Sequence, residues 1–474
     1  MFSKKSWFNQ IERTTEAQKR SLFTWMEAIK RIGKGTGTQA VKYRKIAQKE
    51  MENCKDVIPV WIMPINRVME NLKLTDNLFD VVIVDESSQS DISAITVLMR
   101  AKKAIIVGDE KQISPEAIGK DHVAVETLIN TYLEDIPHAE WFDLKTSLYN
   151  TALRVFPNRL LLKEHFRCVP EIIGFSNELC YSGEIIPLRR IDAKEIVGPF
   201  IVTSKVTQGC RDETKAINAN EAKSIVDKIV ECCSDERYNG MTMGVISLLG
   251  DAQAELILNM LVETLGMEEI LQRRLICGDA YSFQGDERDV MFLSMVIANN
   301  AKFTALTKGS DIRRFNVAAS RARNQMWLFH SVDLEDLNNK CVRYSLLKYC
   351  LEENEPKEEI KSQQYLLLND FEEHIERCIK ESGYKITPKV KVGKYTIDFV
   401  VETDLSLDIP CGHYKKIAVK CIGMPQDENY NWQKQYEMQM CLERVGWEFY
   451  KIRASEFYRN PSIVMDRLSQ KLNN

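Results

Sequence analysis

The clearest feature of the hydrophobic pattern is a pair of short apolar runs that each end in acidic residues. The first, FDVVIVDE at residues 79–86, is rich in β-branched residues and ends on Asp85 and Glu86. The second, KAIIVGDE at residues 103–110, repeats this order. Continuous apolar runs of this length are typical of strands that a parallel sheet buries on both faces. The pattern therefore predicts two buried, parallel strands.

The segment between the two runs, SDISAITVLMRA, has a Ser/Asp cap followed by helical spacing. A strand, a helix and a strand in this order predict a right-handed crossover. The carboxyl ends of parallel strands lie at the edge of the sheet where ligands bind. We therefore expect the polar residues that follow the two runs to meet at that edge: Asp85, Glu86, Asp109 and, in the next loop, Gln112.

Two adjacent acids at a strand end suit nucleotide hydrolysis. One can bind Mg²⁺ while the other polarises the attacking water. The alternative is that Asp85 and Glu86 only cap the helix that follows them. The hydrophobic pattern leaves both interpretations open.

The chain before these strands is predicted to be mainly helical. Residues 1–55 have apolar positions at helical spacing on both sides of the segment GKGTGT, residues 33–38. A phosphate-binding loop needs G-x-x-x-x-G-K-[ST] between a strand and a helix, whereas this segment follows a helix and lacks the final pair. We interpret it as a turn between helices, with a non-standard anion site as the alternative. The run VIPVWIMPI at residues 57–65 is interpreted as a strand or a strand and loop.

A second α/β pattern covers residues 156–345. A polar interval near residues 205–220, expected to be disordered, is followed by the strand MGVISLL and a long helix from about residue 251 to 265. Arginine is usually found on a solvated face, but an arginine directed into a cleft between domains stabilises charge on a transferring phosphoryl group. A basic helix that runs into an apolar strand near the end of this pattern is predicted to carry Arg313, Arg314, Arg321 and Arg323.

Composition narrows the class of protein. A chain of 474 residues suffices for about three domains. The net charge of −4 does not indicate a nucleic-acid-binding protein, although a basic groove can exist locally on such a chain. The 13 cysteines lack metal-site spacing and are interpreted as reduced thiols. Since no signal peptide or membrane-spanning run is recognised, we expect a cytoplasmic protein with no membrane partner.

Five segments resemble, in order and spacing, motifs II to VI of superfamily 1 helicases: VDESSQ, GDEKQISP, EHFRCVPEIIGFSN, SFQGDERDV and NVAASRAR. The closest subgroup is the one that includes the nonsense-mediated-decay RNA helicase. The resemblance covers roughly residues 57–345. It implies an α/β fold with two RecA-like P-loop NTPase domains, residues 56–155 and 156–345, behind a helical segment at residues 1–55. Such domains close on ATP and move along single-stranded nucleic acid.

The resemblance also implies roles for individual residues. Asp85 would bind Mg²⁺, Glu86 would position or activate water, and Gln112 would sense the γ-phosphate. Arg167 and Arg321 would reach that phosphate from the second domain. Other positions that the resemblance assigns are Asp109, Gly285, Glu287 and Arg323 on the nucleotide side, and Ser282 and Phe283 nearer the nucleic-acid strand.

The resemblance lacks one part, because no Walker A loop is recognised before Asp85. The first RecA-like domain is therefore expected to be incomplete, lacking its Walker A strand. Without that strand the two apolar runs would leave apolar edges that a soluble protein should not tolerate. We expect an upstream-encoded polypeptide, the product of a split or truncated gene, to supply the strand. The alternative is a decayed domain that now serves only for binding.

After an acidic linker at residues 346–364, residues 365–474 resemble the restriction-endonuclease fold, and specifically the very-short-patch-repair type of nuclease domain. Such a site binds Mg²⁺ through a cluster of carboxylates. Asp398 matches the first acid, but Lys420 and Ile422 stand where the family has Glu and Asp. We therefore expect a degenerate nuclease site at Asp398 and Lys420 that is inactive. Acids that could substitute for the missing ones are Glu372, Asp427 and Glu428.

These observations predict part of an ATP-dependent superfamily 1 helicase or translocase with a degenerate nuclease domain. The expected cofactors are ATP and Mg²⁺, and the expected partner is single-stranded or duplex nucleic acid, with DNA favoured over RNA. The alternative is a non-catalytic, nucleic-acid-binding or scaffold subunit that kept the fold of a helicase and lost nucleotide binding.

Overall fold

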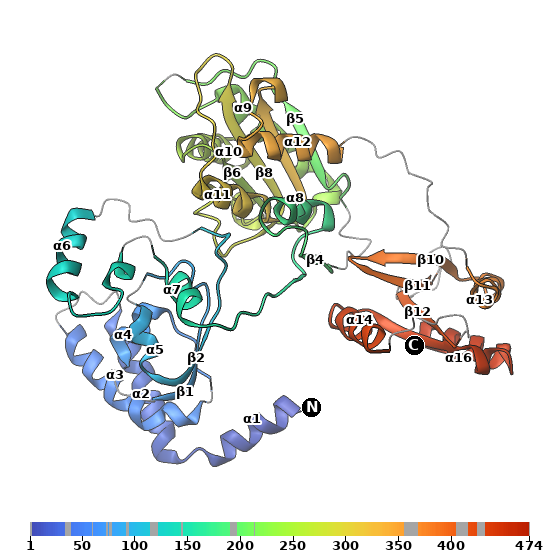
Figure 1. Cartoon of the computed structure of the whole chain (residues 1–474), viewed down its shortest axis with the longest axis horizontal. Helices are drawn as coiled ribbons and strands as arrows, with labels where there is room; N and C mark the ends of the chain where they lie inside the picture. Colours follow the sequence, from blue (N-terminus) through green and yellow to red (C-terminus); the bar gives the residue numbers. More distant parts are fainter. Residues whose placement is uncertain are drawn as a thin grey trace. The chain divides into compact units, whose positions relative to one another are not determined.

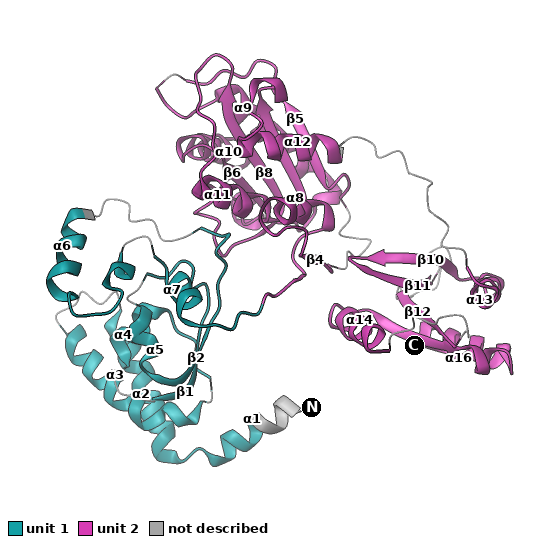
Figure 2. Cartoon of the chain, in the orientation of Figure 1, with its two compact units in different colours: residues 1–160 teal, residues 161–474 magenta. Residues whose placement is uncertain are grey.

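The chain divides into two compact units, residues 1–160 and residues 161–474 (Figure 2). The computed structural model describes residues 2–33, 39–58, 60–72, 74, 78–91, 94–113, 122–143, 146–189, 197–212, 214–354, 368–403, 416–423 and 432–473. Among these residues, no helix is both long and apolar enough to cross a bilayer.

The first unit begins with helices, as the sequence predicts. Thr15 caps the second helix: its hydroxyl accepts from the Gln18 N–H at 3.3 Å, and the Gln18 side chain accepts from the Thr15 N–H at 3.0 Å. Residues 34–38 of the expected turn lie outside the described residues. The elements are α1 (Phe2–Arg13), α2 (Glu16–Ile32), α3 (Ala40–Cys54), the 3₁₀ turn η1 (Lys55–Val57) and α4 (Ile65–Asn71).

These helices share a core with the residues that lead into the first strand. Met51 and Cys54 of α3 are buried with Leu72, and Leu78 and Phe79 pack against them. The helical segment is therefore part of the same packed body as the strand. The described residues between 57 and 65 form no strand, so the prediction of a strand, or of a strand and loop, is wrong for them.

The two apolar runs form strands β1 (Phe79–Val84) and β2 (Ala101–Ile106), which pair in parallel with Val84 opposite Ile106. Only the short helix α5 (Ile95–Leu98) is described between them. One face of this sheet is packed, because Val84 is buried with Ala94 and Leu148. The unit continues with α6 (His122–Tyr132), η3 (Ala139–Phe142) and α7 (Leu148–Val155).

The other face of this two-stranded sheet is open, which corrects the prediction of two fully buried strands. Val81, Ile83 and Ile105 are 45%, 63% and 51% exposed. In a strand, alternate residues point to opposite faces, so Val82 and Val84 face the packed side while Val81 and Ile83 face away from it. Two strands cannot bury both of their own faces, so other segments must pack on each face. Among the described residues, this apolar face stays exposed.

The second unit is built on a five-stranded sheet with the order β5-β9-β8-β6-β7, in which every pairing is parallel (Figure 1). All residues of β6 are buried, as expected of a central strand covered on both faces. Helices α9 and α10 share one apolar core with β6 and β8. The strands are β5 (Ile201–Lys205), β6 (Met243–Ser247), β7 (Ile276–Gly278), β8 (Arg288–Ala298) and β9 (Ala322–Ser331).

Three expectations for this unit need correction. Helix α11 ends at Ala319, so Arg321 follows the helix and Arg323 lies on β9. Helix α12 continues to Asn354 and packs against β5, so residues 346–354 are not a linker. The interval at 205–220 is ordered where described, since Arg211 pairs with Asn218. The helices are α8 (Pro170–Cys180), α9 (Ala219–Ser234), α10 (Ala252–Gln272), α11 (Gly309–Ala319) and α12 (Val342–Asn354), with 3₁₀ turns η5 (Glu236–Tyr238) and η6 (Leu334–Asp336).

A buried carboxylate stabilises an irregular point of this sheet. Glu221 accepts hydrogen bonds from the Val296 N–H at 2.8 Å and from the hydroxyls of Ser294 and Ser331 at 2.7 and 2.9 Å. The pairing of β8 with β9 shifts register here, and Val296 has a φ of +67°, a conformation that β-branched residues rarely adopt. Burial raises the pKa of Glu221 to about 7.

This raised pKa predicts a pH dependence of stability. Between about pH 4.5 and pH 7 the folded chain binds a proton at Glu221 more tightly than the unfolded chain does, so stability is lost as pH rises through this range. The expected loss is about 3 kcal/mol. The side chain of glutamine is neutral at every pH. Between pH 5 and pH 8, the free energy of unfolding of Glu221→Gln should therefore fall by about 3 kcal/mol less than that of the natural protein. Equal slopes in denaturant titrations of the two proteins would contradict the assignment.

The last part of the second unit has a mixed four-stranded sheet, with the order β10-β11-β12-β13, in which only β12 and β13 pair in parallel. The helices pack with this sheet in two separate apolar cores. One core contains residues of α13, α15 and α16, and the other contains residues of α14. The strands are β10 (Lys385–Val392), β11 (Tyr395–Glu402), β12 (Lys416–Ile422) and β13 (Glu448–Arg453). The helices are α13 (Asp370–Glu381), α14 (Trp432–Arg444), α15 (Ala454–Phe457) and α16 (Pro461–Asn473).

Candidate nucleotide site and nuclease-like site

In the first unit, two carboxylates follow β1. The Asp85 carboxylate accepts from the backbone N–H of Glu86 at 2.9 Å, and the Glu86 carboxylate accepts from the Gln89 side-chain amide at 2.8 Å. Glu86 has a φ of +51°, so the chain turns sharply at this point. Both side chains are exposed. Exposed carboxylate oxygens of this kind are ligands that fit Mg²⁺.

The loop that follows β2 is tied to this turn. The N–H and the hydroxyl of Ser87 both donate to the Val107 carbonyl, at 2.9 and 2.6 Å. The side-chain amide of Gln112 donates to Asp109 at 3.3 Å. A Cβ atom on Gly108 would lie 2.8 Å from the Ser87 hydroxyl oxygen, so the close approach of the two loops needs glycine there. The structure thus brings all four residues expected at this edge onto two linked loops.

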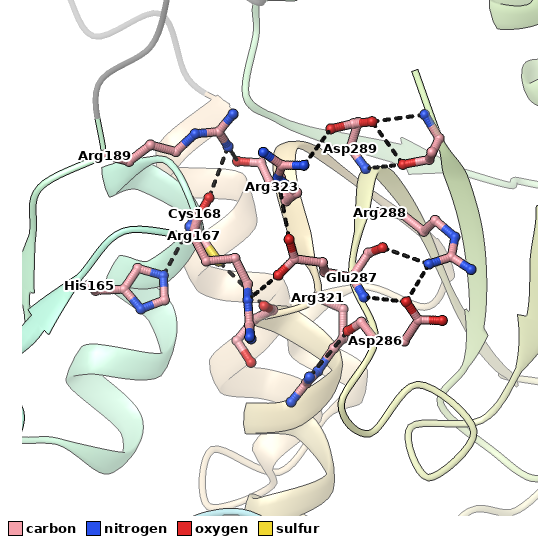
Figure 3. A network of polar contacts seen from close by, with 12 residues as sticks. His165, Arg167, Cys168, Arg189, Asp286, Glu287, Arg288, Asp289, Arg321 and Arg323 are labelled. Carbon is pink, nitrogen blue, oxygen red and sulfur yellow. Dashed lines mark hydrogen bonds and ion pairs between the residues drawn. The ribbon is translucent and has the colours of Figure 1, made fainter. Parts of the chain in front are cut away.

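In the second unit, arginines and acids form a network at the start of β8 and β9 (Figure 3). Glu287 lies between two arginines: it pairs with Arg167, and it lies 3.6 Å from the Nε atom of Arg323. Arg323 also lies 3.6 Å from Asp289, which accepts from the N–H and hydroxyl of Thr242 at 2.9 and 2.8 Å. The sequence assigned Arg167, Glu287 and Arg323 to the nucleotide, and the structure places them together.

Arg321 occupies a different position from these partly exposed side chains. It is buried, and it donates to the Val317 carbonyl at 3.1 Å and to the Asp286 carbonyl at 3.2 Å. The Asp286 side chain pairs with Arg288 at 2.6 Å, and this hydrogen bond lowers the pKa of the Asp286 carboxyl. In this conformation Arg321 therefore ties the end of α11 to the loop before β8.

The network carries excess positive charge. Burial and the nearby Arg167 and Arg189 lower the pKa of His165 to about 4, so this imidazole is neutral at pH 7. The ion pairs and hydrogen bonds of the network join five arginines and three carboxylates, a formal net charge of +2 for these side chains. Such a cluster favours an anionic ligand. Its charged members are Arg167, Arg189, Arg288, Arg321, Arg323, Asp286, Glu287 and Asp289.

The loop before β8 contains the other residues that the sequence singled out. Gly285 has a φ of +80°, which favours glycine at this turn. Ser282 is exposed, and its hydroxyl donates to Asp279 at 2.9 Å. Phe283, in contrast, is fully buried and packs beneath Gly244, and the expected proximity of this loop to a nucleic-acid strand stays a prediction. The aromatic ring of Phe283 contributes to the core.

Arg189 belongs to the network but was missed by sequence analysis. Its guanidinium donates to the Arg167 carbonyl at 3.0 Å and to the Arg323 carbonyl. Arg189 lies outside all five motif-like segments, directly after the apolar stretch IIPL. Local sequence gave no signal for it, because its partners are backbone atoms that only the fold brings close.

The nuclease-like part contains two acid–lysine pairs at the expected degenerate site. Asp398 accepts from the Cys421 N–H at 2.9 Å and pairs with Lys420 at 3.0 Å. Glu372 lies beside it and pairs with Lys389 at 2.6 Å. The ligand atoms of Glu372, Asp398 and Cys421 lie within 4.8 Å of one another. Of the acids that could substitute, Glu372 therefore reaches Asp398, whereas Asp427 and Glu428 lie outside the described residues.

This arrangement does not fit a hard divalent cation. The two lysine ammonium groups pair with the two carboxylates and neutralise the negative charge that would attract a divalent cation. Burial raises the pKa of the Cys421 thiol above its usual range, which keeps it protonated and makes it a poor metal ligand. The chemistry of metal-dependent phosphodiester cleavage is therefore not assigned to these residues.

Replacing one lysine should create a metal site. Lys420→Glu removes the ammonium group that lies 3.0 Å from Asp398 and adds a carboxylate. We expect Mn²⁺ or Mg²⁺ at about 100 times its Kd to stabilise this variant by about 2.7 kcal/mol, seen as a rise in Tm, and to leave the natural chain unchanged. Lys420→Gln, which removes the charge without adding an acid, is the matched control. A metal-dependent rise in the natural chain would contradict the neutralised site.

Three family models match separate parts of the chain. Models of an AAA domain match residues 12–120 and residues 144–333. A third family model, REase_MTES_1575, matches residues 371–472. The first match includes both α2 and the β1–β2 sheet, in keeping with their shared core.

Among curated proteins, the uncharacterized ATP-dependent helicase MG140 of Mycoplasma genitalium is 25% identical over 90% of this chain and 39% of its own length. DNA polymerase alpha-associated DNA helicase A of Saccharomyces cerevisiae is 26% identical over 58% of this chain and 42% of its own length. The regulator of nonsense transcripts 1 homolog of Arabidopsis thaliana is 23% identical over 66% of this chain and 24% of its own length. The chain thus matches less than half the length of each of these relatives.

Proposed function

We propose that this chain, which carries superfamily 1 helicase-like AAA domains followed by a restriction-endonuclease-like domain, acts in an ATP-dependent nucleic-acid helicase or translocase. The observation that carries the proposal is the pair of linked loops after β1 and β2, which present two carboxylates and a glutamine at one edge of a parallel sheet. Hydrolysis of a nucleoside triphosphate needs this set of groups.

The residues of the first unit divide the work as follows. Asp85 would bind Mg²⁺, and Glu86 would orient the attacking water and accept its proton. Asp109 lies on the nucleotide side and positions Gln112, because its carboxylate accepts a hydrogen bond from the Gln112 side-chain amide at 3.3 Å. Gln112 then senses the γ-phosphate. Bound MgATP supplies the phosphoryl group and the cation that neutralises its charge.

For the second unit, the resemblance to superfamily 1 helicases supports a proposal that its arginines supply positive charge during phosphoryl transfer. Arg167 and Arg321 are proposed to stabilise the transferring phosphoryl group, as arginine does in related phosphoryl transfer. Arg323 and Glu287 line the nucleotide side, together with Gly285. The net charge of +2 on the network supports this assignment, because it favours an anionic ligand. ATP would compete with Glu287 for the two arginines that now pair with it.

Among the described residues, the β1–β2 sheet has two strands and one exposed apolar face, and this supports a further part of the proposal. Exposed apolar side chains on strands are a surface that another segment covers. We propose that a strand bearing a Walker A loop, carried by an upstream-encoded polypeptide, completes this sheet. The backbone N–H groups of that loop would surround the phosphates.

The nucleic-acid substrate is proposed to be DNA. Two of the relatives are named as DNA helicases, one from Saccharomyces cerevisiae and one from Mus musculus. The exposed Ser282 lies on the loop proposed to approach the strand. The nuclease-like domain is proposed to bind without cleaving, because its two acids are neutralised by lysines.

The test is ATPase activity of the full chain in Mg²⁺, without nucleic acid, with single-stranded DNA and with single-stranded RNA. A fluorescent ATP analogue measures nucleotide binding in parallel. Hydrolysis stimulated by DNA at least as strongly as by RNA supports the proposal. If the analogue shows no saturable binding while DNA still binds with salt-dependent affinity, the chain alone is a non-catalytic binding subunit. Addition of the upstream-encoded polypeptide then tests whether a supplied Walker A strand restores hydrolysis.

A further inference from the structure

A short two-stranded ribbon connects the nuclease-like domain to the arginine network. Strands β3 (Glu164–His165) and β4 (Ile186–Pro187) pair in parallel. Two further backbone hydrogen bonds extend the pairing, from the Ile186 N–H to the Lys163 carbonyl at 2.7 Å and from the Leu188 N–H to the His165 carbonyl at 2.8 Å. We call residues 163–165 and 186–189 the β3–β4 ribbon. It lies outside both large sheets of the second unit.

One side of the ribbon is inserted into the nuclease-like domain. Leu188 is 0% exposed and belongs to the apolar core on the α14 face of the nuclease-like sheet. The turn between β10 and β11 approaches the ribbon closely: a Cβ atom on Gly393 would lie 2.8 Å from the Pro187 carbonyl oxygen. Other residues of that core are Ile397, Val400, Ala418, Met438, Leu442 and Trp447.

A polar contact fixes the same side of the ribbon. The Glu164 carboxylate accepts from the Cys441 thiol at 3.1 Å and pairs with Arg444 at 3.3 Å. Both partners lie on α14 of the nuclease-like domain. The ribbon is therefore held on the nuclease-like domain by an apolar contact, through Leu188, and by a charged contact, through Glu164. These contacts fix its position, unlike that of a flexible linker.

The other side of the ribbon supports the arginine network (Figure 3). Arg189, directly after Leu188, donates to the carbonyls of Arg167 and Arg323, the two residues that pair with Glu287. His165 accepts from the Cys168 N–H at 2.9 Å, which fixes the turn that carries Arg167. The low pKa of His165, about 4, keeps its ring nitrogen available as an acceptor at pH 7. Neighbouring residues of the β3–β4 ribbon thus contact both the nuclease-like domain and the arginine network.

We propose that the nuclease-like domain is a positioning element of the nucleotide site, and that burial of Leu188 in its core places Arg189 where it fixes the backbone of Arg167 and Arg323. The inference rests on the proposed function in one respect, namely that these arginines act on ATP. It gives the nuclease-like domain a role that needs no metal and no cleavage. Leu188 and Arg189 are positioning residues, since they act through Arg167 and Arg323.

Two leucine substitutions separate positioning from simple destabilisation. Leu188→Ala removes the anchor on the α14 face, whereas Leu468→Ala removes an equally buried leucine, 2% exposed, from the opposite core of the same domain. Both variants of the full chain should lose thermal stability to a similar extent, because each leaves a comparable cavity. Only Leu188→Ala should disturb the network.

Two measurements need no ATPase activity. Hydrogen exchange of a peptide covering residues 163–169, which contains the Cys168 amide, should accelerate by about tenfold or more in Leu188→Ala and stay unchanged in Leu468→Ala. The pKa of His165, followed by NMR, should rise from about 4 toward 6.5 only in Leu188→Ala, because the imidazole becomes hydrated.

A third measurement, kinetics of ATP hydrolysis, addresses the catalytic consequence. Leu188→Ala should lower kcat at least tenfold more than Leu468→Ala does, with a smaller change in KM. If exchange and the His165 pKa change alike in the two variants, or if kcat falls equally in both, the positioning role is wrong. If the natural chain hydrolyses no ATP under any condition, the proposed function fails, while the exchange and NMR results still decide whether the domain fixes the network.

Discussion

Glu86→Gln is expected to lower kcat for ATP hydrolysis by about 10²–10⁴-fold, the usual contribution of a positioned general base. Glutamine has the same shape but cannot accept the proton of the attacking water. Glu86 is exposed and its one described side-chain partner is the Gln89 amide, so the substitution should leave the Tm nearly unchanged. Steady-state ATPase assays of the nucleic-acid-stimulated enzyme, alongside thermal unfolding, measure both quantities.

Glu110→Gln provides the matched control for this prediction. Glu110 lies on the neighbouring loop after β2 and pairs on the surface with Lys111 at 3.5 Å and with Arg159 at 3.8 Å. The same chemical change there should alter kcat by less than about twofold, because weak surface pairs contribute little. An equal fall of kcat in the two variants, or an unchanged kcat in Glu86→Gln, would show that Glu86 is not the base. Nucleotide binding should persist in both variants.

The elements that sequence analysis predicted well are those with a continuous apolar signal of their own. β1, β2 and β6 are strands because their runs are long, β-branched and bounded by polar residues. The parallel pairing of β1 with β2 followed from the helix between them. Burial was less predictable, because the exposure of Ile83 and Ile105 depends on which other segments cover the sheet, and no pattern within the strands records this.

In the candidate site, too, positions next to recognisable strands could be predicted, whereas the packing of side chains could not. Asp85, Glu86, Asp109 and Gln112 could be placed together because the first two directly follow one recognisable strand and the other two lie in the loop after the next. The burial of Phe283 could not be predicted, because an aromatic residue in a polar loop gives no sign that its ring fills space beneath Gly244. Leu188 could not have been assigned at all, since a short apolar stretch gives no sign that its packing partners lie in another domain.

Arg167→Ala is expected to lower kcat by about 10³-fold or more, the contribution of an arginine that stabilises the transferring phosphoryl group. Its effect on stability should be below about 1 kcal/mol, because Arg167 and Glu287 are 39% and 38% exposed and Glu287 keeps its second arginine, Arg323. The variant therefore tests catalysis without unfolding the network. ATPase kinetics and denaturant titration together measure the two effects.

Arg321→Ala should behave differently, although the sequence assigns both arginines to the same phosphate. Its buried guanidinium donates to the carbonyls of Val317 and Asp286, and the Val317 carbonyl also accepts from the Ser320 hydroxyl at 3.2 Å. Truncation therefore removes the Arg321 hydrogen bond to the buried Asp286 carbonyl and costs about 1–3 kcal/mol of stability in addition to any loss of kcat. A stable but inactive Arg321→Ala would mean that this side chain leaves its buried position to act on ATP. A fully active Arg167→Ala would instead remove Arg167 from the reaction and leave Arg323 as the remaining exposed partner of Glu287.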